Sequence, residues 1–269
     1  MISVQTNLNS LLAQENLRVN NEFQSQTIQR LTSGYRINQS GDDAAGLAVA
    51  NGYRSSVAEL TQGVRNANDG VSTLQIVDGG LSNITKMLDR AKTLATESAS
   101  GTFTGDRTTL DNEYQDLLGE INRQADNIGL GKTTKTNAVS LSVYIGGGSG
   151  ATETVDLSKG QVDAGTLGLK GDLTSAGNAT TEITAIDTAL GSVGTIQGTV
   201  GSGQNKLNYA TQLAQSQISS FSAAESRIRD ADMAAEAANL TKAQVLQQAS
   251  IAAMAQANSA PQAVLALLK

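Results

Sequence analysis

Two stretches without charged side chains, one at each end of the chain, constrain the fold most. No Asp, Glu, Lys or Arg occurs from Ala243 to Leu268, and the first fourteen residues contain none either. Both stretches nevertheless carry a helical pattern of apolar residues. A wide apolar face on a charge-free helix is not stable in water, so each stretch needs partner helices. We therefore expect the two ends to pack together and against other copies of the chain.

The C-terminal stretch has the pattern of a coiled coil. Small and apolar residues recur there at alternating steps of three and four, which defines a heptad seam: Ala243, Leu246, Ser250, Ala253, Ala257, Ala260, Val264 and Leu267. A second seam beside it contains Ile251, Met254, Leu265 and Leu268. The apolar stripe at the other end of the chain begins with Val4, Leu8, Leu11 and Leu12.

Composition favours long helices packed side by side. Apolar residues make up 39% of the chain, but aromatic residues only 3%, so any core must consist of Leu, Ile, Val and Ala. Pro261 is the single proline, which leaves nearly the whole chain free of helix breakers. The net charge of −6 argues against a nucleic-acid binder. Many Gln and Asn residues in 243–268 argue against a membrane span.

The first half of the chain predicts three helices. Residues 3–35 form the first, in which Glu15, Arg18 and Glu22 share one polar face and are expected to pair. A non-helical joint is expected at Gly34–Gly41. A helix over 43–99 follows, roughly 85 Å long at ~1.5 Å per residue. The third helix runs over about 106–128 with these residues inward: Leu110, Tyr114, Leu117, Ile121 and Ile128.

The middle of the chain is richer in Gly, Thr and Ser. Apolar residues alternate at Leu141, Val143 and Ile145, and a turn at Gly146–Gly150 follows, so we expect a β-hairpin within 129–179. Helix resumes near Thr180. The fold class is therefore mainly α: a long antiparallel bundle or coiled coil built from the N- and C-terminal segments, with a small β-hairpin between them. Its core is expected to contain Val57, Leu60, Val64, Val71, Leu74, Leu81, Leu88, Ile186, Leu190 and Leu207.

Few residues are suited to catalysis or metal binding, so no enzyme activity and no cofactor or metal are expected. The chain has no Cys and no His, which removes thiolate chemistry and the commonest general base. Two pairs of carboxylates, Asp42 with Asp43 and Asp230 with Asp232, are expected to cap helices. Three methionines have helical core spacing and are expected to pack: Met87, Met233 and Met254.

Four segments resemble bacterial flagellins. The N-terminal segments read QTNLNSLLAQENL, IQRLTSGYRINQSGDDAAGLAVANGYR and RNANDGVSTLQIVDGGLSNI. The C-terminal segment reads FSAAESRIRDADMAAEAANLTKAQVLQQASIAAMAQANSAPQAVLALL. The resemblance covers about 1–128 and 180–269. It departs from the family at Arg229, where an acidic residue is usual, and at DNIGLGKTTKTN, which lacks the usual FNG-type turn.

The resemblance implies a structural subunit that self-assembles into the flagellar filament used for swimming. It assigns 1–42 and 226–269 to a filament-core domain and 43–128 with 180–225 to an outer bundle that includes the hairpin region 129–179. Assembly would then use the apolar residues of both ends: Val4, Leu8, Leu11, Leu12, Leu246, Ile251, Met254, Val264, Leu265, Leu267 and Leu268.

The resemblance also implies partners and a location. Besides other copies of the chain, the partners are a flagellar export chaperone, the filament cap and hook-junction proteins. The N-terminus lacks the pattern of a cleaved signal peptide, so the family's export route to the extracellular filament is expected. A host Toll-like receptor is a further expected partner, with Arg90, Leu94 and Glu113 as its contacts; alternatively, Arg90 and Glu113 are a solvated interhelical pair.

Two other functions are alternatives to a filament subunit. One is a hook–filament junction protein of the same superfamily, which shares the terminal helices but differs in its middle. The other is a secreted enzyme on a helical scaffold, since some flagellins carry a zinc protease insert. That insert needs an HExxH motif, which a chain without histidine does not have.

Overall fold

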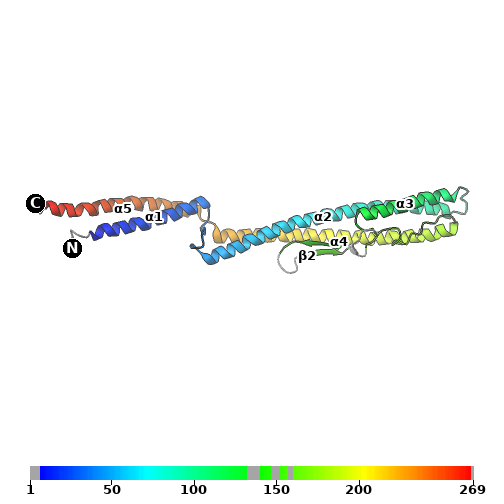
Figure 1. Cartoon of the computed structure of the whole chain (residues 1–269), viewed down its shortest axis with the longest axis horizontal. Helices are drawn as coiled ribbons and strands as arrows, with labels where there is room; N and C mark the ends of the chain where they lie inside the picture. The colour runs from blue at the N-terminus through cyan, green and yellow to red at the C-terminus, as the bar shows by residue number, and fades with distance from the viewer. Residues whose placement is uncertain (1–6, 132–139, 147–151, 157–159, 268–269) are drawn as a thin grey trace. The chain divides into compact units, whose positions relative to one another are not determined.

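The computed structural model describes residues 7–131, 140–146, 152–156 and 160–267; within these ranges the side chains of 155–156 and 260–267 are not described. The element order is α1 (Leu8–Ser33), α2 (Ala44–Ala99), α3 (Arg107–Asn127), β1 (Ser140–Tyr144), β2 (Thr152–Asp156), α4 (Ala176–Arg229) and α5 (Met233–Leu267) (Figure 1). The mainly helical fold with one small hairpin is therefore confirmed.

The chain divides into two compact units, 1–55 with 220–269 and 56–219. Each unit joins an N-terminal to a C-terminal part of the chain. The boundaries fall inside α2 and α4, whereas the prediction placed them next to the joint, at 42/43 and 225/226. The assignment of the two units to an inner and an outer part of an assembly stays a prediction.

In the first unit, α1 and α5 pack side by side as the terminal pair (Figure 1). Helix α1 begins where the Asn7 side chain accepts a hydrogen bond from the Ser10 amide, at 3.2 Å. It ends at Gly34, whose φ of 74° is the left-handed conformation that glycine adopts most easily. The predicted helix over 3–35 is confirmed for Leu8–Ser33; residues 3–6 lie outside the described residues.

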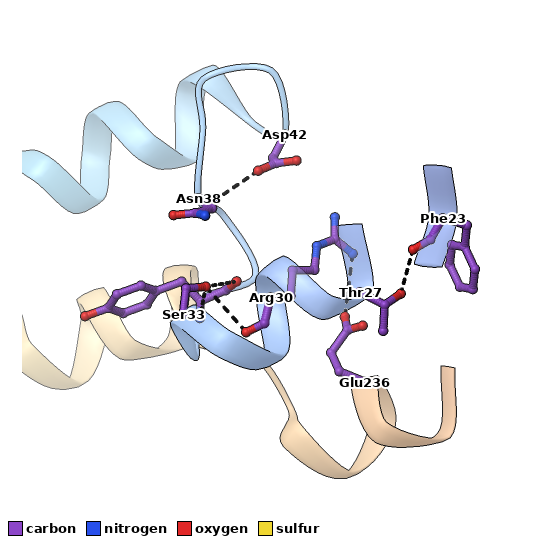
Figure 2. Close-up of polar contacts among 8 residues, drawn as sticks. Phe23, Thr27, Arg30, Ser33, Asn38, Asp42 and Glu236 are labelled. Atoms are coloured by element: carbon purple, nitrogen blue, oxygen red, sulfur yellow. Dashed lines mark hydrogen bonds and ion pairs between the residues drawn. The ribbon is translucent and has the colours of Figure 1, made fainter. Parts of the chain in front are cut away.

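The predicted joint after Gly34 is confirmed, and two carboxylates organise it. Asp42 Oδ2 accepts hydrogen bonds from the amides of Asn38 (Figure 2) and Gln39, at 3.0 and 3.1 Å, and these bonds lower the pKa of the Asp42 carboxyl. Asp43 Oδ1 accepts from the Gly46 amide at 2.8 Å and caps the start of α2. The expected capping function is therefore confirmed for Asp43, whereas Asp42 binds the backbone of the joint and not the first turn of the helix.

The two breaks between helices in the first unit are tied to each other. Tyr35 and Asp230 form an antiparallel bridge, with bonds from the Arg36 amide to the Arg229 carbonyl at 2.7 Å and from the Ala231 amide to the Gly34 carbonyl at 2.9 Å. Asp232 Oδ1 then accepts from the amides of the first turn of α5, at 2.9 and 3.1 Å. Helix α5 therefore starts next to the end of α1.

The second unit has an aliphatic core made by α2, α3 and α4. Of the predicted core residues, six are buried: Leu60, Leu74, Leu81, Leu88, Ile186 and Leu207. The other four are partly buried: Val57, Val64, Val71 and Leu190. In α3 the fully inward residues are Tyr114 and Ile121, as expected, but Leu118 is buried more deeply than the predicted Leu117.

The predicted β-hairpin is confirmed. Strands β1 and β2 pair antiparallel, with Val143 opposite Glu153. Its attachment to α2 requires a glycine: a Cβ on Gly63 would lie 1.6 Å from the Ile145 carbonyl oxygen. The hairpin therefore approaches the α2 backbone more closely than any side chain there would permit.

The segment 160–173 differs from the prediction. The sequence analysis treated 129–179 as a hairpin with variable loops, but 160–173 packs into the second unit, with these residues buried: Val162, Leu167, Leu169 and Leu173. Glu182, only 2% exposed, accepts bonds from the Tyr114 hydroxyl at 2.7 Å and from the amides of Lys170 and Gly171 at 2.8 and 3.1 Å. A buried carboxylate thus satisfies the loop backbone, which allows the loop to pack inward. Helix α4 then begins at Ala176, where the Ser175 hydroxyl accepts from the Asn178 amide at 3.2 Å.

Candidate functional site

The contact between α1 and α5 is unusually polar. The least exposed positions of both helices follow heptad spacing: Ala13, Leu17, Asn20, Gln24, Thr27 and Leu31 on α1, and Glu236, Leu240, Ala243, Gln247, Ser250, Met254 and Ala257 on α5. Asn20 Nδ2 donates to the Ala243 carbonyl at 2.9 Å and Asn7 Nδ2 to the Ala257 carbonyl at 2.7 Å. Polar side chains and alanines therefore fill much of the space that large apolar residues occupy in most helix pairs.

Many large apolar side chains of the same helices are exposed, although Leu17, Leu31 and Leu240 lie in the contact. The exposed fractions of predicted assembly residues are 74% for Leu8, 52% for Leu11, 64% for Leu12, 44% for Leu246 and 50% for Ile251. Four further residues of α1 and α5 are exposed as well: Val19, Ile28, Met233 and Val245. An exposed apolar surface of this extent is typical of association sites. We call the exposed apolar side chains of α1 and α5 the outer apolar face.

The structure describes the side chain of one of the remaining predicted assembly residues. Met254 is partly buried. Val4 and Leu268 lie outside the described residues, as do the side chains of Val264, Leu265 and Leu267, whose backbone is helical to Leu267. Among the methionines expected to pack, Met233 does not: it is 48% exposed, because its place in the first turn of α5 puts it on the solvent side.

The polar face predicted on α1 is confirmed. Arg18 contacts Glu15 at 2.7 Å and Glu22 at 3.4 Å, and all three side chains are mostly exposed. The hydrogen bond and the charge of Arg18 lower the pKa of Glu15, and those of Glu15 raise the pKa of Arg18. Exposed pairs of this kind contribute little to stability. This cluster keeps one face of α1 polar.

Arg229, the departure from the flagellin pattern, has a clear structural environment. Its guanidinium lies 4.1 Å from the centre of the Tyr35 ring, in cation–π geometry. It also donates to the Ile37 carbonyl at 3.4 Å and lies 3.9 Å from Glu225. The basic residue thus joins the end of α4 to the joint after α1.

The three predicted receptor contacts differ in accessibility. Arg90 and Glu113 form an exposed ion pair at 2.6 Å between α2 and α3, which agrees with the interhelical pair given as the alternative. Leu94 is only 1% exposed and lies in the core of the second unit. The use of Leu94 as a surface anchor is therefore incompatible with the structure, because its side chain fills the helical core.

The sequence analysis missed the buried polar residues of the terminal pair. Asn20 and Glu236 are each 8% exposed and Thr27 is 1% exposed. A signal was present, since Asn20 and Thr27 are seven residues apart and so share one heptad position.

Within the part of the chain that the structure describes, no cluster of three or more potential metal-ligating side chains occurs. In those same ranges, no helix combines the length and apolarity that crossing a bilayer would require.

The geometry defines a class of protein: a helical subunit whose terminal helices leave an apolar face uncovered, as a self-assembling chain does. Comparisons with known proteins agree. Residues 4–131 match the family description "Bacterial flagellin N-terminal helical region" and residues 183–268 match "Bacterial flagellin C-terminal helical region".

Relatives match over nearly the whole chain. A flagellin of Halalkalibacterium halodurans is 37% identical over 98% of this chain and 98% of its own length. The "Flagellar filament 30.7 kDa core protein" of Treponema maltophilum is 35% identical over 97% and 98%. Among solved structures, a Bacillus cereus flagellin is 29% identical, covers 55% of this chain and 88% of its own, and has a TM-score of 0.48.

The chain belongs to the bacterial flagellin family. It is a structural subunit of the flagellar filament, an extracellular assembly of its own copies, and not an enzyme. The relatives are named flagellin or filament core protein, and none supports the hook–filament junction protein.

Proposed function

We propose that the outer apolar face of α1 and α5 is the surface through which the chain binds other copies in the filament core. The observation that carries this proposal is the pattern of burial in the terminal pair, in which the most deeply buried side chains include an amide and a carboxylate while many large aliphatic side chains are exposed. Burial of one such side chain contributes about 1.5–3 kcal/mol. Several exposed residues per chain, repeated over every subunit, supply a large driving force for assembly.

Paired substitutions on one helix test this proposal. The variant Leu246→Ser/Ile251→Ser removes from α5 two aliphatic side chains that are already about half covered, for an expected loss of about 1.5–3 kcal/mol per subunit. The critical concentration for filament growth should then rise by about ten- to a hundredfold. The matched control Gln244→Ser/Gln248→Ser changes two exposed amides of the same helix and should leave it nearly unchanged. Equal critical concentrations for both double variants would contradict the proposal.

The proposal includes an arrangement of the two units. Residues 1–42 and 226–269 form the filament core, and 43–128 with 180–225 form the outer bundle, to which the hairpin region 129–179 belongs. The charge-free stretches at both ends support the first assignment, and the aliphatic core that α2, α3 and α4 complete by themselves supports the second.

Export and capping partners follow from the same surface. We propose that an export chaperone covers the C-terminal part of α5 before assembly, that export uses no cleaved signal peptide, and that the filament cap and hook-junction proteins contact the ends of the polymer. Deleting 261–269 should block both chaperone binding and filament growth. A truncated chain that is exported and polymerises normally would contradict this.

Recognition by a host Toll-like receptor is proposed for the exposed Arg90 and Glu113 only. Both side chains are about half exposed and a guanidinium makes charge-assisted bonds readily. Their mutual ion pair must reorganise for the receptor to bind. Signalling by the depolymerised Arg90→Ala variant should be weaker than signalling by the parent chain, and equal signalling would reject the contact.

A further inference from the structure

The polar interior of the terminal pair contains one ion pair, Arg30 with Glu236. We infer that this pair fixes the register of α1 against α5, and so determines which side chains make up the outer apolar face. The consequence for assembly rests on the proposed function above, whereas the control of register stands independently of it.

The pair lies where α1 ends and α5 begins (Figure 2). Arg30 Nη1 is 3.5 Å from Glu236 Oε1, and the two side chains are 30% and 10% exposed. The other carboxylate oxygen, Oε2, is buried and has no hydrogen-bond partner among the described residues. The Thr27 hydroxyl, one turn before Arg30, donates to the Phe23 carbonyl of its own helix at 2.9 Å. The carboxylate is therefore buried with a single charged partner.

This arrangement is poorly suited to stabilising the helix pair. A buried ion pair costs desolvation free energy, and an unpartnered carboxylate oxygen adds to that cost. Well-packed apolar residues at the same positions are often equally or more stabilising. The best-attested function of a buried polar residue in a heptad seam is to specify the register of its helix.

Apart from the partly buried Leu17, Leu31 and Leu240, few other contacts between α1 and α5 distinguish one register from another. The side chains of Asn7 and Asn20 donate to backbone carbonyls of α5, which recur at every helical turn. The fully buried residue of the α5 seam is Ala243, and much of the surrounding helix is alanine, which offers similar packing after a shift. Gln247 and Asn21 bond side chain to side chain at 3.1 Å, but at an exposed position.

Arg30, by contrast, has a single acidic partner available on α5. Glu236 is the only acidic residue in the sequence of α5, and Lys242 is its only basic one. A slip of one turn shifts α5 by about 5.4 Å along its axis and separates the two charges. It also leaves the buried Glu236 carboxylate without its partner, which is strongly unfavourable. The ion pair therefore selects one register among several that packing alone would accept.

The absence of cysteine makes the register measurable by cross-linking. Asn21→Cys with Gln247→Cys places two thiols at positions whose side chains touch in the native register. Asn21→Cys with Ser250→Cys reports a shift of about one turn. A short bis-thiol reagent is applied to subunits and to filaments, and the intrachain products of each pair are quantified.

Three changes are compared in both cysteine backgrounds. Arg30→Leu/Glu236→Leu removes the charges but keeps buried side chains. Arg30→Glu/Glu236→Arg reverses the pair. Glu15→Gln is the matched control, because Glu15 also pairs with an arginine of α1 but is exposed. The dileucine variant should gain the 21–250 product, and its critical concentration should rise about tenfold. The charge-reversed variant and the control should give the 21–247 product alone, as the parent does.

The outcomes separate the two levels of the inference. Exclusive 21–247 product in the dileucine variant, or no product in the parent, would overturn the control of register. A shifted product with an unchanged critical concentration would overturn the consequence for assembly. If Leu246→Ser/Ile251→Ser assembles normally while the dileucine product shifts, the proposed function fails and the register inference stands.

Discussion

Four glycines in α4 give a sharp test of how the second unit is stabilised. Gly191, Gly194, Gly198 and Gly201 recur at steps of three, four and three, so they lie along one face of the helix. A Cβ built on any of them meets no atom within 4 Å. Packing within the chain therefore does not require glycine at these positions.

The expected gain from alanine follows from helix propensity. A glycine in a helix interior is about 0.8–1 kcal/mol less favourable than alanine, and compatible Gly→Ala changes have gained about 0.4–1 kcal/mol. Replacing all four glycines should therefore raise the free energy of unfolding by about 2–4 kcal/mol. For a unit of this size the melting temperature should rise by roughly 5–15 °C, measured by circular dichroism on depolymerised subunits.

Gly63→Ala is the opposite control. Its Cβ would overlap the Ile145 carbonyl, so the hairpin or α2 must shift, and the variant should melt below the parent. A quadruple variant that melts at or below the parent temperature would refute the argument. It would mean that the helix over 191–201 needs a bend or a close contact that four alanines prevent.

Three further predictions concern the same two units. Glu182→Gln should destabilise the second unit by about 1.5–3 kcal/mol, because a neutral amide replaces the charged acceptor of three hydrogen bonds. Urea titration measures this loss, and an unchanged midpoint would show that the loop 160–173 does not depend on the Glu182 carboxylate. Burial and the Glu182 contact raise the pKa of Tyr114, so the folded chain keeps a proton that the unfolded chain releases above about pH 10. Stability should be complete below that pH and fall above it by up to about 1.4 kcal/mol per pH unit, a slope that Tyr114→Phe removes and the exposed Tyr209→Phe does not. Limited proteolysis of dilute subunits should cut α1 and α5 before α2, α3 and α4. Among the described side chains of α1 and α5, Ala243 is the only buried apolar one, so little apolar burial holds these helices in place. Equal protection of both units would contradict this prediction.

The helices of this chain could be located from sequence because local signals mark their ends. Gly34 ends α1 in a left-handed conformation, and the Asp43 carboxylate caps α2, as the sequence predicted. The inward face of α5 could not be predicted in the same way. Its Ala-rich sequence is apolar on most sides, so periodicity does not show which side faces α1.

The usual rule that large apolar residues face inward failed for the terminal pair for a physical reason. Leu246 and Ile251 point outward, while Asn20, Thr27 and Glu236 are buried between the helices. A single chain does not contain the partners that would cover the aliphatic residues. Burial in one subunit therefore says little about which residues carry the association, and the sequence alone does not reveal whether a seam closes within a chain or between chains.

The two units thus satisfy the hydrophobic effect at different stages. The second unit buries its Leu and Ile side chains within one chain and is expected to be stable as a subunit. The terminal pair buries an amide and a carboxylate, and many of its aliphatic side chains stay exposed. Under the proposed function, the polar interior keeps the pair specific but weak until assembly supplies the apolar burial. A more apolar interior would stabilise the free subunit, yet it would also lower the preference for a single register on which a regular outer face depends.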